Sequence, residues 1–303
     1  IILWVANQQH LYFGSFVLAV PIFCMLIEFI GIRVREEDPV MSGKYDRLAK
    51  DLMKVSLTAY SWTAILGGIL LFTFITLFPG FFKYMAGIFR PVMHVYALMF
   101  LAESGVLYVY YYGWDRMKDD KFLKWIHCSL SVLLNLIGTV LMYLANSWAT
   151  FMQAPGGIDS EGRFLGNIWH VIHSTLWNPV GVHRILGNIV FGGGIVGAYA
   201  AYHYLTAKNE EERAHYDWVC YVAMFICIFG LIPLPFAGYW LMKEVYAFRQ
   251  QMGITLMGGI MAWLFIIQAV MIGLLFFAAN SYLHNGMARV KGSHRYMKYC
   301  KYM

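Results

Sequence analysis

The chain has 303 residues, of which 60% are hydrophobic and only 13% are charged, and it carries a formal charge of +6 at neutral pH. A water-soluble domain carries about a quarter charged residues, so this composition excludes an ordinary soluble protein and indicates that lipid surrounds most of the surface. The basic residues lie in short segments between hydrophobic runs and form no basic stripe, which excludes a nucleic-acid-binding surface.

Hydrophobic runs bounded by charged residues or by Pro and Gly predict an all-α bundle of about seven transmembrane helices. The predicted spans are 11–32, 55–79, 90–112, 124–147, 183–206, 216–241 and 254–282. The longest connection, 148–182, contains Pro155-Gly156-Gly157, and its apolar part 164–177 is predicted to lie at the outer membrane surface. We expect one membrane domain over residues 1–303, multi-pass in a bacterial cytoplasmic membrane.

The distribution of Lys and Arg predicts the orientation of the bundle. With the N-terminus outside, 17 basic residues fall on the inner side and six on the outer side. Because positively charged loops resist translocation, this asymmetry predicts an outside N-terminus and an inside C-terminus.

The ten histidines divide into two groups under this orientation. Five fall at the outer face: His10, His94, His170, His173 and His183. An imidazole in hydrocarbon is costly unless its nitrogen is satisfied, either by a metal or haem iron or by a neighbouring carbonyl; the shared depth favours a cofactor. The other five are expected near water at inner helix ends, without a special role: His127, His203, His215, His284 and His294.

Methionine can be the second axial ligand of a low-spin haem. Met252 and Met257 open the seventh predicted span at the depth where His183 opens the fifth, and Arg249 beside them could pair with a haem propionate. With 18 methionines in the chain, spacing alone favours a chance position for Met252 over haem ligation.

Two carboxylates fall inside predicted spans. Glu103 lies midway through the third span, where an ionised carboxylate is expensive, so we expect a protonated or hydrogen-bonded group suited to relaying protons. Glu28 lies nearer the inner end of the first span. It could belong to a proton path from the inner side, or its carboxylate could simply reach the interface.

Several motifs, in order along the chain, resemble subunit I of the cytochrome bd quinol oxidases. The most specific is Gly113-Trp-Asp-Arg116. The others are Gln9-His-Leu-Tyr-Phe13, Ile27-Glu-Phe29, Phe100-Leu-Ala-Glu-Ser104, Ala145-Asn-Ser-Trp148, Met152-Gln-Ala-Pro155, Trp177-Asn-Pro-Val180 and Ala247-Phe-Arg-Gln-Gln-Met252. The resemblance is to a short, divergent member of that family.

The resemblance implies roles for individual residues. His10 would ligate a high-spin haem near the outer face, Glu103 would belong to a buried carboxylate pair beside the haems, and Arg249 and Met252 would serve a low-spin haem b. The implied cofactors are one or more haems b, with haem d as a further candidate.

The chain also departs from the family pattern. The column of the family's low-spin haem histidine meets Gly187 or Asn188, so His183 is the substitute. The column of the first carboxylate of the buried pair falls near His94 or Val95, so His94 is a candidate extra or replacement ligand. The long quinol-binding loop is absent between the sixth and seventh spans, and the family's last helices, with the glutamate ligand of the second high-spin haem, are missing. Either a partner chain supplies those parts, or the chain is a bd-derived electron-transfer module.

The resulting functional prediction is a haem-binding subunit of a respiratory complex, and two alternatives stand beside it. Electrons would pass from quinol or a cytochrome through haem b to oxygen or a partner, and a subunit II-like chain or cytochrome subunits are the expected partners. A transporter or channel is the first alternative, supported by Gly67-Gly68, Gly192-Gly-Gly194 and Gly258-Gly259. A structural anchor of a membrane complex is the second.

Overall fold

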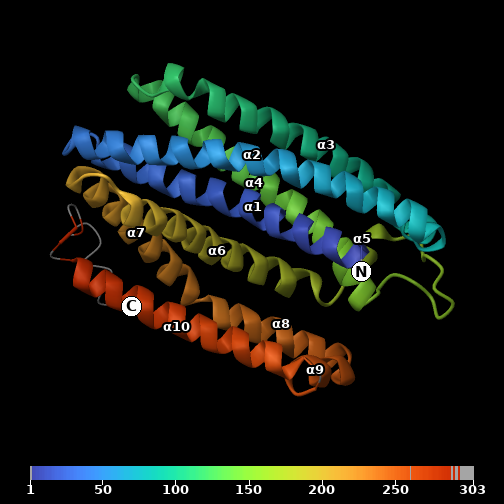
Figure 1. The fold of residues 1–303 in the computed structure, drawn as a ribbon. Helices are drawn as coiled ribbons and strands as arrows, with labels where there is room; N and C mark the ends of the chain where they lie inside the picture. The colour runs from blue at the N-terminus through green and yellow to red at the C-terminus, as the bar shows by residue number, and fades with distance from the viewer. Residues whose placement is uncertain (1, 260, 288, 291–292, 294–303) are drawn as a thin grey trace. The chain divides into compact units, whose positions relative to one another are not determined.

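A computed structural model of the protein describes residues 2–259, 261–287, 289–290 and 293. In this part of the chain the regular structure is ten α-helices, and seven candidate spans are long and apolar enough to cross a membrane (Figure 1). The predicted all-α bundle of about seven spans is confirmed, while the outside position of the N-terminus stays a prediction. His294 lies outside the described residues.

The helices group into two compact units, one up to Trp177 and the other from Asn178 onward. The single membrane domain expected from the sequence stays a prediction.

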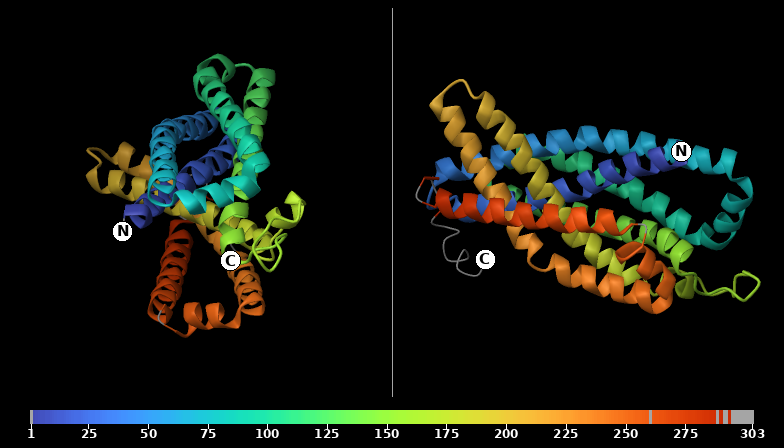
Figure 2. Two further views of the ribbon diagram at one scale, coloured as in Figure 1. Left: turned by 90° about the vertical axis from the view of Figure 1, so that its right-hand side faces the viewer. Right: turned by 60° about the horizontal axis from the view of Figure 1, so that its bottom comes forward.

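Unit 1 is built on four long helices: α1 (Ile2–Val34), α2 (Pro39–Leu77), α3 (Pro79–Met117) and α4 (Lys121–Gln153). Each of α1 and α3 packs against both α2 and α4, so the four helices enclose a common interior (Figures 1 and 2). Two aspartates fix where helices begin, because the side chain of Asp38 accepts from Met41 N and that of Asp120 accepts from Leu123 N.

The two ends of unit 1 are stabilised differently. At one end the turns 35–38 and 118–120 meet, and the Arg35 guanidinium donates to the backbone carbonyls of Lys118 and Asp119. We call this the turn end; it is the end expected to face inward. At the other end an apolar core joins α3 and α4 to the short helix α5 (Ile168–Ile172): Met85, Ile88, Phe89, Val92, Phe151, Val171 and Ile172. Within the predicted interfacial segment 164–177, only this short stretch and the start of the next helix are helical.

Unit 2 contains α6 (Trp177–Thr206), α7 (Glu210–Leu231), α8 (Leu234–Phe248), α9 (Gln250–Met257) and α10 (Ala262–Gly286). Helices α7 and α8 follow each other across Pro233 and together form one candidate span. The last span begins at Ala262 rather than at residue 254, because α9 ends at Met257 before Gly258 and Gly259. Tyr282 of α10 donates to Asp217 of α7 at 2.5 Å and links the two helices.

Candidate functional site

A cluster of ionisable side chains lies inside unit 1 near its turn end. It consists of Glu28 from α1, Asp46 from α2, and Lys124 and His127 from α4. The Oε1 atom of Glu28 lies 2.5 Å from Nδ1 of His127 and 2.7 Å from Nζ of Lys124, which also contacts Asp46 Oδ1 closely. Glu28 is 1% exposed and His127 is fully buried. We call these four residues the ion cluster.

Two aromatic residues of α3 complete the bonding of the ion cluster. The Tyr110 hydroxyl donates to Glu28 Oε2 at 2.7 Å, and the Tyr110 carbonyl accepts from His127 Nε2 at 2.8 Å. Trp114 Nε1 donates to Asp46 Oδ2 at 3.0 Å, while its ring lies 4.7 Å from Lys124 Nζ. The desolvated charges are therefore paired and hydrogen-bonded, as buried charges must be.

The ion cluster corrects two expectations from the sequence. The interpretation of His127 as a histidine near water is wrong, and so is the alternative in which Glu28 reaches the interface, because both side chains are enclosed. Sequence reasoning also missed Asp46 and Lys124, which look like ordinary charges beside a turn. A spacing of three or four residues along α4 is the pattern that could have revealed the site: Lys124, His127, Ser131, Asn135 and Gly138.

The motif Gly113-Trp-Asp-Arg116 divides its side chains between the interior and the surface of unit 1. Trp114 is fully buried on the ion cluster, whereas Asp115 forms an exposed pair with Lys50 at 2.6 Å. The motif therefore contributes a hydrogen bond to the buried ion cluster and an ion pair to the exposed surface near the turn end.

Glu103 lies two helical turns before Tyr110 in α3, further from the turn end, and is 7% exposed. No described side chain hydrogen-bonds its carboxyl group, although the neighbouring Ser104 shares a 2.6 Å hydrogen bond with Tyr60. Gly138 of α4 makes room for Glu103, because a Cβ atom at position 138 would lie 2.9 Å from Glu103 Oε1. Glu28 and Glu103 are thus both buried in unit 1 but at different levels of the bundle.

His10 of α1 faces α2. Its Nδ1 atom lies 3.2 Å from the carbonyl oxygen of Thr63, and a carbonyl only accepts, so Nδ1 carries the hydrogen in this bond. The ring rests on Gly67, where a Cβ atom would lie 3.0 Å from the ring carbon Cε1. This arrangement fits a haem ligand, because iron-bound histidines donate their other ring N–H to a carbonyl or carboxylate.

The other outer histidines of unit 1 lie in more open positions. His94 on α3 and His170 on α5 are exposed, and His173 contacts the ring of Trp177 with centroids 4.5 Å apart. Among the described residues, no group of three or more His, Cys, Asp or Glu side chains is placed to hold a metal ion.

In unit 2, His183 lies on α6 and is partly buried, with the backbone of Gly238 of α8 beside its ring. A Cβ atom at position 238 would lie 3.6 Å from His183 Nε2, so the space beside this nitrogen is bordered by a glycine. Arg249 ends α8 and is exposed, and Met252 follows in α9 and is partly buried. No described hydrogen bond or ion pair joins these three side chains.

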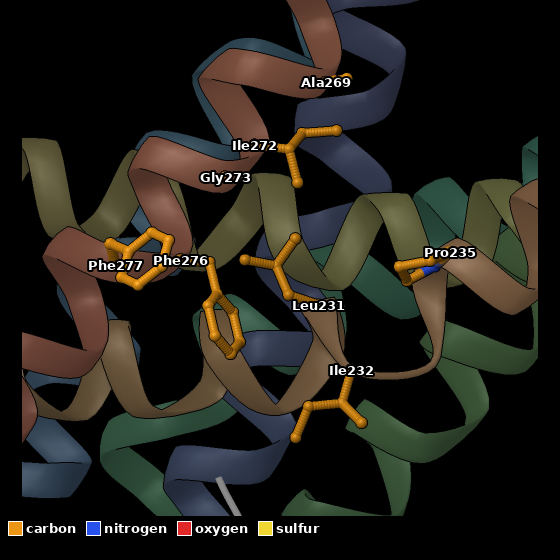
Figure 3. Close-up of a pocket in the computed structure, with 8 residues that line it drawn as sticks. All are labelled: Leu231, Ile232, Pro235, Ala269, Ile272, Gly273, Phe276 and Phe277. Carbon is orange, nitrogen blue, oxygen red and sulfur yellow. The ribbon is translucent and has the colours of Figure 1, made fainter.

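An open apolar pocket of about 540 Å³ lies in unit 2 where α7 gives way to α8 (Figure 3). Helix α10 forms its other wall. Its lining residues are Leu231, Ile232, Pro235, Ala269, Ile272, Gly273, Phe276 and Phe277. These residues present no polar side chain, so the pocket suits a hydrocarbon chain and has no side chain that could coordinate an ion.

The fold and the buried groups define a polytopic helical membrane protein with ionisable side chains in its interior. A family model, cytochrome bd terminal oxidase subunit I, matches residues 5–262. A similar solved structure is the bd oxidase from Geobacillus thermodenitrificans, with a TM-score of 0.72 and 15% identity. The alignment covers 82% of this chain and 55% of that one, and at this identity the likeness shows the fold. A search of curated proteins found no match.

The chain belongs to the cytochrome bd terminal oxidase subunit I family. The resemblance inferred from the motifs is confirmed, and the chain is a multi-pass membrane subunit of respiratory type. It spans about half the length of the solved relative.

Proposed function

We propose that this protein is the haem-carrying subunit of a bd-like respiratory complex in a bacterial cytoplasmic membrane. Electrons from quinol or a cytochrome would pass through haem b toward oxygen or a partner subunit. Family membership over residues 5–262 supports the proposal. A subunit II-like chain or cytochrome subunits are the proposed partners.

The observation that carries the proposal is the bond between His10 and Thr63. With Nδ1–H donated to the Thr63 carbonyl, the ring adopts the tautomer whose Nε2 lone pair can bind iron. Gly67 keeps the adjacent face of α2 close to the ring, which fixes its orientation. Both contacts match the needs of an axial ligand, so His10 is the proposed ligand of the first haem.

The proposed ligands of a second, low-spin haem b are His183 and Met252 of unit 2, with Arg249 pairing with a propionate. The glycine beside His183 Nε2 and the exposed guanidinium of Arg249 fit these roles. His94 is retained as an additional candidate ligand, although its exposed position gives it no supporting contact.

When bound, haem iron would supply the one-electron chemistry, and the chain's own residues would orient it and manage protons. Glu103 is the proposed proton carrier near the haems, because a buried carboxyl without a counter-charge favours its protonated form. Glu28 is the proposed earlier station on the path from the turn end. The same proposal keeps haem d as a further candidate cofactor and names oxygen or a partner subunit as the final electron acceptor.

The test is a reduced-minus-oxidised spectrum of protein purified after haem-replete expression, followed by pyridine haemochrome analysis. Haem b bands are expected, and the haemochrome separates haem b alone from haem b with haem d. A colourless protein would contradict the proposal.

Substitutions then assign the ligands. His10→Ala and Met252→Ala should each remove one haem, whereas the exposed His170→Ala and Met261→Leu should leave haem content unchanged. Equal haem content in all four variants would overturn the residue assignment.

A further inference from the structure

The hydrogen bonds of His127 determine how many protons the ion cluster holds. The Tyr110 carbonyl can only accept, so His127 Nε2 carries a hydrogen. The 2.5 Å contact between His127 Nδ1 and Glu28 Oε1 needs one further hydrogen between the two atoms, on either side. One proton is therefore shared by Glu28 and His127.

The charge of the ion cluster explains why this proton is held. Glu28 and Asp46 contribute two negative charges and Lys124 contributes one positive charge, so the shared proton makes the ion cluster neutral. Other titratable side chains facing it are Tyr110 of α3, which donates to Glu28, and Cys24 and Cys128, which are buried nearby. Loss of the shared proton would leave a net negative charge in the interior, which is expensive.

Exposure changes stepwise across the ion cluster. The side chain of Asp46 is 23% exposed, that of Lys124 is 7% exposed, and those of Glu28 and His127 are fully buried. Lys124 contacts both carboxylates. Asp46, the most exposed of the four side chains, therefore connects water at the turn end with the shared proton through Lys124.

Polar groups continue along α4 beyond His127. Ser131 is fully buried one turn further on, and Asn135 donates to the carbonyls of Ser131 and of Pro21 in α1. Gly138, the next position on this face, lies against the Glu103 carboxyl group. The ion cluster thus stands at the turn end of a polar line that points toward Glu103.

We propose that Glu28, His127, Lys124 and Asp46 form a proton-loading site, filled from water at the turn end and discharged toward Glu103. When the Glu28–His127 pair has given up its proton, Lys124 transfers one ammonium proton to it. Asp46, which is ionised at rest, then takes a proton from water and passes it to the neutral Lys124 amine, so that both groups return to their starting charge. The delivery toward Glu103 rests on the proposed function, whereas the loading step does not.

The loading step is tested by hydrogen exchange at the His127 ring, observed by solid-state NMR of the full chain in lipid with ¹⁵N-labelled histidine. In the wild type both ring nitrogens of His127 should give the ¹⁵N signals of hydrogen-bonded nitrogens. After transfer to D₂O, Asp46→Asn should slow exchange at Nδ1 at least tenfold, because an amide keeps the hydrogen bonds but carries no transferable proton. Glu36→Gln, which alters an exposed pair at the same end, should not change the rate.

Two results would overturn the proposal: an unchanged or faster exchange in Asp46→Asn, or a His127 ring with a nitrogen that is not hydrogen-bonded in the wild type. A substitution that loosened the fold would give faster exchange, and this outcome also counts against the proposal. The measurement needs no haem, so a haem-free preparation would contradict the proposed function while leaving this test decisive.

Discussion

Glu28 and Glu103 are two carboxylates buried in the same helical unit, but their surroundings are opposite. Glu28 has hydrogen-bonding partners on two further helices, among them Lys124, His127 and Tyr110, whereas Glu103 has none among the described side chains. Burial alone therefore does not define the role of a carboxyl group in the membrane. Partners hold Glu28 in an ionic network that joins the helices, whereas Gly138 leaves room beside the Glu103 carboxyl group.

Removing Lys124 should have the largest effect. Lys124→Met leaves Glu28 and Asp46 as buried carboxylates without their cation, and we expect it to lower the free energy of unfolding by about 3 to 5 kcal/mol. Thermal unfolding in detergent would measure this loss. Lys121→Met removes an exposed partner of Glu36 one turn earlier and should leave the melting temperature unchanged. Equal melting temperatures for the two variants would show that the ion cluster is not a stabilising network.

The same substitution at both carboxylates sharpens the comparison. Glu28→Gln breaks the pairs with Lys124 and His127 and should cost about 3 kcal/mol. Glu103→Gln removes no described partner and should change stability by less than about 1 kcal/mol. Chemical unfolding of both variants checks this difference, and a larger loss at Glu103 would reverse our interpretation of the two sites.

Gly138 tests whether the room beside Glu103 matters. In Gly138→Ala the new methyl group would lie 2.9 Å from Glu103 Oε1 and 3.1 Å from Leu18 Cδ2, so we expect a loss of about 1 kcal/mol as these groups shift. Gly105→Ala, with nothing within 4 Å of its added Cβ, should gain roughly 0.5 kcal/mol from helix propensity. A gain of stability in both variants would mean that α3 and α4 move apart at this point without cost, so that the room beside Glu103 is not needed.

Asp159 is a third kind of carboxylate, because it lies in the connection after α4 and its hydrogen-bonding partners belong to the same loop. A hydrogen bond from the Arg163 backbone, then one from the Arg163 side chain, lowers the pKa of Asp159 below its ordinary 3.8. Because the folded pKa is the lower one, this loop is fully stabilised above the ordinary value and loses the contribution as pH falls through the folded pKa. The protection of the amides of residues 158–164, measured as their exchange rate relative to an unstructured peptide at the same pH, should fall on acidification in the wild type. Asp159→Asn should abolish that acid dependence, and a dependence that persists would exclude Asp159 as its source.

Helical organisation was predictable because it depends on local composition. Long apolar runs must satisfy their backbone groups internally in lipid, so they specify helices wherever they occur. The boundary of the last span was harder to place, since Gly258 and Gly259 interrupt a stretch that is apolar throughout. Glu103 was recognisable for the same local reason, as a charge far from either interface.

The ion cluster could not be found this way. Lys124 and Asp46 lie close to turns in the sequence, and a charge near a turn is ordinarily hydrated. Only the packing of α1, α2, α3 and α4 shows that these side chains point inward. His127 was misjudged because its distance from the helix end was known but the face on which it lies was not.

The amino-acid sequence by itself determined that the chain crosses the membrane, how often it does so, and the family to which it belongs, because hydrophobicity and short motifs are read residue by residue. The tertiary structure decided which ionisable groups meet. Contacts such as Glu28 with His127 join residues 99 positions apart, and their pairing depends on the relative rotation of whole helices, which no local pattern specifies.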